Sequence, residues 1–96
     1  MITTLTNKLY NQAEILNLMN RYNIKNPDTR KTIKLNLRRI LKTYDIKPTD
    51  LIALGYSSPN VYAWTGQVSP NVPMLQQALH IACEFDFSIE EFLKEI

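Results

Sequence analysis

The amino-acid sequence predicts an all-helical domain, and three observations lead to this fold class. Apolar residues recur at the 3.6-residue period of helices, and no stretch keeps the strict alternation of a strand. The 96 residues are 45% hydrophobic, which suits one small domain with a single core. Five Pro and two Gly are too few for a loop-rich or collagen-like chain. Together these observations favour five or six helices.

The first expected helix runs from about Asn7 to Tyr22 and carries apolar residues in two stripes. Two stripes on one short helix indicate burial on more than one side. Pro27 follows. Because proline disfavours helix at the residue before it and suits a first helical position, it separates this helix from the next.

The second expected helix runs from about Asp28 to Tyr44. Its core stripe has amphipathic spacing and consists of Ile33, Leu37, Ile40, Leu41 and Tyr44. Its outer face holds the densest positive charge of the chain, namely Arg30, Lys31, Lys34, Arg38, Arg39 and Lys42. Such a face is either a solvated helix surface or a contact for a polyanion.

A short third helix is expected between Pro48, which suits a first helical turn, and Gly55, which suits the left-handed position just past a helix end. Ser57 or Ser58 can cap a fourth helix that spans residues 57–64. The turn residues of "TGQVSPNVP" then predict a loop.

Two apolar residues give the fourth helix its orientation. Val61 and Trp64 lie six and nine positions after Gly55, on one side of that helix. They are expected to pack on the preceding helix through Leu51 and Leu54, while Gly55 allows the sharp turn between the two. The opposite side of the helix would then face outward, where it can enter a DNA major groove.

A fifth helix is expected over about Val72 to Phe85, with apolar positions at its 3.6-residue period. The stretch "FSIEEF" at residues 87–92 follows it. Its Ser88 and Glu91 have the spacing of a capping box, and its two phenylalanines have that of a hydrophobic staple. A final short helix from Ile89 to about Lys94 is therefore predicted.

Three segments carry a family resemblance: "NLRRILKTYDI", "LGYSSPNVYAW" and "PNVPMLQQALHIACEFDFSIEEFL". They resemble the opening helix, the turn with its recognition helix, and the closing helices of the Cro/phage-repressor helix-turn-helix family, also called the xenobiotic-response-element family. The resemblance covers residues 33–93, about two thirds of the chain. It implies a five- to six-helix lambda-repressor-like helix-turn-helix domain over residues 29–96. Residues 1–28 would form an extra N-terminal helical extension that dimerises or caps the core.

The sequence departs from the family pattern at several positions. Leu51 stands where a small Ala is common, and Thr65 and Leu41 stand where many relatives carry an ion pair. The recognition helix carries no Lys, Arg or Gln.

Carried over position by position, the resemblance implies a set of DNA-facing residues. On the recognition helix these are Ser58, Pro59, Asn60, Tyr62 and Ala63, with Ser57 as its cap. Residues that can hold backbone phosphates are Lys47, Thr49, Thr65, Gln67 and Arg38. Asn60 can pair with adenine, whereas no side chain offers a bidentate contact to guanine, so an A·T-rich operator is expected.

The charge of the chain is unevenly distributed. Residues 1–49 hold ten Lys or Arg against three carboxylates, a net +7, whereas residues 50–96 have a net −5. Such asymmetry is typical of a chain with one end on a polyanion. The expected partners are double-stranded DNA and a second copy of the chain in a homodimer.

No catalytic, cofactor-binding or metal site is expected, so the protein is predicted not to be an enzyme. His80 and Cys83 are three residues apart, but no further His or Cys accompanies them. The lone cysteine and the polar N-terminus predict a cytoplasmic protein without a membrane span.

The predicted function is DNA binding as a repressor-like transcriptional regulator of phage or mobile-element type. The alternative is a protein-interaction module with the same fold, such as an antitoxin, an anti-repressor or an inhibitor of a nucleic-acid enzyme. The uncharged recognition helix and the acidic second half of the chain favour that alternative.

Overall fold

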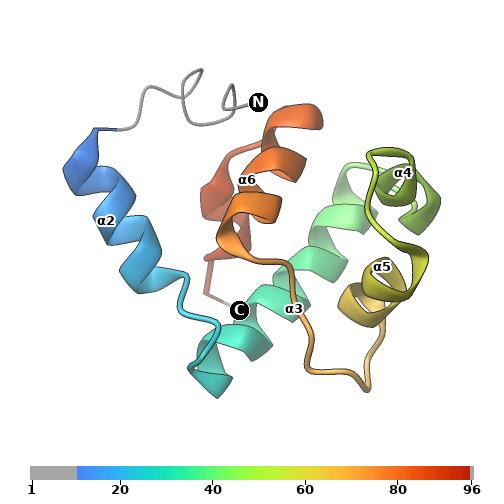
Figure 1. Ribbon diagram of the computed structural model, residues 1–96, viewed down its shortest axis with the longest axis horizontal. Helices are drawn as coiled ribbons and strands as arrows, with labels where there is room; N and C mark the ends of the chain where they lie inside the picture. The colour runs from blue at the N-terminus through green and yellow to red at the C-terminus, as the bar shows by residue number, and fades with distance from the viewer. Residues whose placement is uncertain (1–10, 96) are drawn as a thin grey trace.

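In the computed structural model, residues 11–95 are described, and they form five α-helices and one 3₁₀ helix with no strand (Figure 1). The all-helical prediction is thus confirmed for these residues. In chain order the elements are α2 (Gln12–Arg21), α3 (Pro27–Thr43), α4 (Pro48–Ala53), α5 (Ser58–Thr65), α6 (Leu75–Glu84) and η1 (Ile89–Phe92). Within the described range, no helix has the length and apolar character needed to cross a membrane.

The longest helix, α3, runs through the middle of the molecule, with α2 on one side and α4 and α5 on the other (Figure 1). Its predicted core stripe is buried apart from Tyr44, which is 40% exposed. Tyr44 instead stacks on Phe87, with ring centroids 5.0 Å apart. Leu18 of α2 and Tyr22, the C-cap of that helix, belong to the same hydrophobic core as α3.

Side chains of asparagine fix the starts of the first two described helices. Asn11 accepts a hydrogen bond from the Glu14 amide at 2.8 Å, and the Glu14 carboxylate accepts one from the Asn11 amide at 3.2 Å. This reciprocal pair begins α2 at Gln12. The part of the predicted first helix before residue 11 lies outside the described residues. Asn26 caps α3 with one hydrogen bond, which its side chain accepts from the Asp28 amide at 2.9 Å, and Pro27 lies in the first turn.

Helices α3 and α6 end in the same manner. Asp45 and Asp86 adopt left-handed backbone conformations, with φ of 53° and 56°. The amide after each reaches back into its helix: Ile46 N–H donates to the Leu41 carbonyl and Phe87 N–H to the Ala82 carbonyl. This closure returns a buried apolar side chain to the core at both ends.

Helix α6 is shorter than predicted. The expected start at Val72 is wrong, because Val72 and Pro73 lie outside any helix and α6 begins at Leu75. Proline at 73 disfavours helix at the residue before it. Both residues are buried all the same, and the Tyr22 hydroxyl donates to the Pro73 carbonyl at 2.7 Å.

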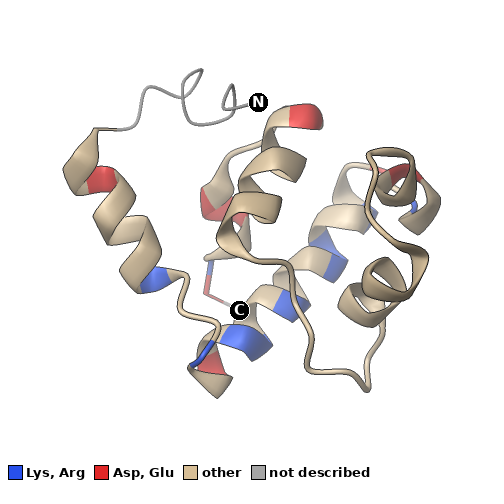
Figure 2. Cartoon of the chain, in the orientation of Figure 1, with Lys and Arg blue, Asp and Glu red and all other residues tan. Residues whose placement is uncertain are grey.

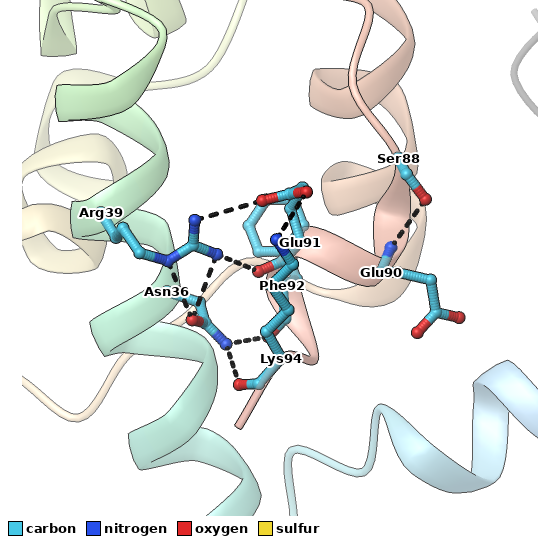
Figure 3. Close-up of polar contacts among 7 residues, drawn as sticks. All are labelled: Asn36, Arg39, Ser88, Glu90, Glu91, Phe92 and Lys94. Atoms are coloured by element: carbon cyan, nitrogen blue, oxygen red, sulfur yellow. Dashed lines mark hydrogen bonds and ion pairs between the residues drawn. The ribbon is translucent and has the colours of Figure 1, made fainter. Parts of the chain in front are cut away.

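The predicted capping box at Ser88 is also wrong, and η1 is a single 3₁₀ turn that ends at Phe92 (Figure 3). The Glu91 amide donates to the main-chain carbonyl of Ser88, as a 3₁₀ turn requires, so the Ser88 hydroxyl accepts from Glu90 instead. The Glu91 carboxylate pairs with Arg39 at 3.1 Å. The predicted apolar contact is confirmed: Phe87 and Phe92 are both buried, with centroids 5.9 Å apart.

Candidate nucleic-acid interface

The turn between α4 and α5 has the geometry that its sequence predicts. Gly55 follows α4 with φ of +110°, a conformation that side chains of L-residues rarely adopt. Ser57 caps α5, accepting a hydrogen bond from the Asn60 amide at 3.3 Å. Val61 and Trp64 are buried at 0% and 4% exposure. Helices α4 and α5 therefore pack on each other, and the far side of α5 faces outward.

The outward side of α5 consists of uncharged residues. Ser58, Pro59 and Asn60 are exposed, and Tyr62 is 54% exposed. Ala63 is partly buried. The residues expected to meet base edges are therefore exposed apart from Ala63, and α5 carries no charged residue (Figure 2).

The residues expected to hold phosphates lie on α3, on α4, at the end of α5 and in the loop after it. Lys47 and Thr49 are exposed at the first turn of α4, where the Lys47 amide donates to the Asp50 carboxylate at 2.8 Å. Gln67 is exposed just past the end of α5. The Thr65 hydroxyl instead donates to the Val61 carbonyl at 3.1 Å, so it satisfies its own helix.

Lys34 occupies a position that the sequence did not predict. The sequence places it on the outer basic face of the second helix, yet it is 8% exposed. Its ammonium donates to the main-chain carbonyls of Ala63, Trp64 and Gly66 at 2.7, 2.8 and 3.0 Å. An ammonium has three donors, and all three are directed at the C-terminal end of α5.

This contact provides hydrogen-bond donors for carbonyls at the C-terminal end of α5. The last carbonyls of a helix lack partners within it and carry partial negative charge, and α5 has no basic residue in its last turn. Lys34 supplies that charge from α3. Burial, and then the neighbouring charge of Arg38, lower the pKa of the Lys34 ammonium.

Arg38 lies one turn after Lys34 on the same side of α3 and is partly buried. Arg39 points to the other side, where its guanidinium donates to the Glu91 carboxylate and main-chain carbonyl at 3.1 and 2.8 Å (Figure 3). The basic residues of α3 therefore do not form one continuous face. Lys34 is buried, and Arg30 and Arg39 donate hydrogen bonds to other groups of the protein.

The sequence does not predict a second contact at the turn, which Tyr56 makes. Tyr56, the residue after Gly55, packs edge-on against Trp64 with centroids 5.3 Å apart. Its hydroxyl hydrogen-bonds with Nδ1 of His80 on α6. Burial, and then the charge of Glu84, raise the pKa of Tyr56. The turn is thus attached to α6 as well as to α5.

Comparison with known proteins finds no matching family model, no matching curated protein and no matching solved structure. The resemblance to the helix-turn-helix family stays a prediction from the sequence. The geometry of the described residues is therefore what supports a function.

Proposed function

We propose that this protein is a DNA-binding transcriptional regulator of repressor type, as carried by phages and mobile elements, and that α5 enters the major groove. The observation that carries the proposal is the outward presentation of α5, whose other side is fixed by the burial of Val61 and Trp64. A helix presented in this way after a tight turn has the shape that fits a major groove.

The chemistry of the exposed side chains defines what they would read. Asn60 can donate to and accept from the edge of adenine, and Pro59 and Ala63 can touch a thymine methyl. Tyr62 can hydrogen-bond a phosphate. With no arginine to contact guanine, the reading would favour A·T-rich sites, and each good contact would contribute about 1–3 kcal/mol of discrimination.

Positive charge beside α5 would supply the affinity. Lys47 at the start of α4 and Arg38 on α3 would supply it, and the uncharged Gln67 just past α5 would add a hydrogen bond; contacts to phosphate position a protein without reading sequence. Thr49 belongs to the same set. Thr65, whose hydroxyl bonds within α5, is the least suited of the predicted contacts.

The homodimer is part of the same proposal, with α2 as the interface. Leu16 and Met19 of α2 are 59% and 56% exposed. Met19 also lines a groove of about 380 Å³ between α2 and α6, whose walls are mainly apolar and include Leu75 and Leu79. A two-fold contact between identical chains uses the same self-complementary patch on both copies, and this exposed apolar surface offers such a patch.

The same groove favours the second candidate, a protein-interaction module. An apolar surface of this kind also suits a helix of another protein. The two candidates differ in the role of α5: a regulator needs its exposed side chains, whereas a module that binds through the α2–α6 groove does not.

The experiment is a DNA-binding titration of Asn60→Ala and Tyr62→Ala, with Asn17→Ala as the matched control. Asn17 is exposed on α2, away from α5. The proposal expects the first two variants to lose roughly tenfold or more in preference for the protein's own upstream DNA over scrambled DNA. The control should bind like the unchanged protein. An equal preference for the upstream DNA in the three variants and the unchanged protein would show that α5 does not read the sequence.

A further inference from the structure

A basic pocket lies where the loop after α5 meets the first half of α3. It has a volume of about 260 Å³. Arg30, Lys31 and Lys34 line it from α3, and Gln67 and Ser69 line it from the loop. The lining includes no carboxylate. Three cationic side chains therefore border one pocket without an acidic neighbour in its wall.

The two outer cations differ in how firmly they are placed. Arg30 is partly buried, and its Nη1 donates to the Ile24 carbonyl at 2.8 Å, which fixes the guanidinium at the pocket. A guanidinium has five N–H donors in a rigid plane, so one bond to a carbonyl leaves others for a ligand. Lys31 is exposed at the next position and can move toward a ligand.

Lys34 contributes charge to this pocket. Its three donors are directed at the α5 carbonyls, one of them Gly66 at the base of the loop. Those carbonyls are dipoles and carry no net charge, so the ammonium still adds a positive field to the pocket. Gln67 and Ser69 of the loop line the same pocket and have side chains that can donate hydrogen bonds.

We propose that this pocket binds a phosphate group, and specifically a backbone phosphodiester of the DNA that α5 reads. Arg30 would hold the phosphate oxygens through paired N–H groups, and Lys31 would add a mobile charge. The identification of the phosphate as part of DNA rests on the proposed function. Because the loop begins at the end of α5, the contact would lie beside the recognition helix and would add affinity without reading bases.

The first test uses inorganic phosphate alone, so that it does not depend on DNA. Titration followed by amide NMR, at constant ionic strength against chloride, should give saturable shifts confined to residues 30–31 and 66–69. Lys31→Gln should weaken this binding several-fold. Lys25→Gln, which removes an exposed lysine outside the pocket, should leave it unchanged. Lys31 is exposed, so its replacement should not unfold the protein.

The second test separates the two sources of phosphate. If the ligand is DNA, Lys31→Gln should reduce the slope of log affinity against log salt by about 1, as expected for one lost phosphate contact, while Lys25→Gln should not. Phosphate binding with an unchanged DNA slope would assign the pocket to a free phosphate or a phosphorylated small molecule and overturn the DNA assignment.

The absence of localised shifts together with an unchanged slope would show that the pocket does not bind phosphate. Failure of the proposed function gives a different pattern, in which phosphate still binds at the pocket but no DNA is preferred. Preference for the upstream DNA without phosphate binding or a slope change would leave the proposed function standing and reject the pocket.

Discussion

The two flanks of α3 both carry basic residues, but they use them differently. On the η1 side, Arg39 pairs with the carboxylate of Glu91, and Asn36 donates to the carbonyls of Phe92 and Lys94 at 2.9 and 2.8 Å (Figure 3). On the α5 side, Lys34 pairs with carbonyls that carry no net charge. The η1 side thus compensates its positive charge, whereas the α5 side retains it.

This difference indicates where a polyanion would bind. Carboxylates gather at η1 and the C-terminal residues, while α5 and the loop to α6 carry none (Figure 2). A carboxylate neutralises the charge of Arg39 on the η1 flank, whereas no carboxylate of the described residues neutralises that of Lys34 on the α5 flank. The sequence alone predicts one basic outer face on α3, whereas the contacts show that its two flanks differ in net charge.

The largest effect on stability is expected at Lys34. Lys34→Met would leave three carbonyls without their cation and should lower the free energy of unfolding by about 2–3 kcal/mol. Urea denaturation would measure this. Lys31→Met is the matched control, because Lys31 is exposed on the same helix and should change stability by less than about 0.5 kcal/mol. Equal stability of the two variants would show that Lys34 does not hold α5.

A smaller loss is expected on the opposite flank. Asn36 is 1% exposed, and Asn36→Ala would leave the carbonyls of Phe92 and Lys94 without a donor. The expected cost is about 1–2 kcal/mol of unfolding free energy. Asn17→Ala on the surface of α2 should be close to neutral. A neutral Asn36→Ala would mean that η1 is held by its apolar residues alone.

Acidic pH should weaken the η1 flank selectively. Hydrogen bonds and charges of Lys94 and Arg39 hold the pKa of Glu91 below its ordinary value of 4.5. A carboxylate whose pKa is lower in the folded state stabilises it above pH 4.5, and this contribution is lost as pH falls through the folded pKa. Thermal unfolding from pH 7 to pH 3 should therefore show a smaller stability loss for Glu91→Gln than for the unchanged protein. Parallel profiles would contradict the ion pair.

The smallest effect is expected for the ion pair between α2 and η1. Arg21 and Glu90 form two hydrogen bonds of 2.8 and 2.9 Å, but their side chains are 41% and 53% exposed. Arg21→Gln should cost roughly 0.2–1 kcal/mol. NMR titration should show the pKa of Glu90 rising toward its ordinary value, since Arg21 is what lowers it. An unmoved Glu90 pKa would show that the pair does not persist in solution.

Much of the fold follows from local sequence signals. The amphipathic stripe predicts α3, and Gly55, Ser57, Val61 and Trp64 predict the turn and the orientation of α5, because each requirement lies within a few residues. The apolar periodicity predicts that α6 starts at Val72. Pro73 disfavours helix at that residue, and α6 starts later.

The remaining features depend on residues far apart in the sequence. Lys34 borders the core stripe of α3, and only the position of the α5 carbonyls 29–32 residues later decides that it turns inward. Glu91 has the spacing of a cap, but the guanidinium of Arg39 offers it stronger, charge-assisted hydrogen bonds. Such competition between local and distant partners cannot be settled from spacing.

The most direct test of DNA reading by α5 is a fluorescence anisotropy titration against the protein's own upstream DNA and scrambled DNA, at two salt concentrations. The proposal predicts binding at least about a hundredfold tighter to the upstream DNA, since specific binders typically exceed non-specific affinity by roughly 10³ or more. Equal, steeply salt-dependent binding to both sequences, or no binding to either, would contradict it and direct attention to a protein partner at the α2–α6 groove.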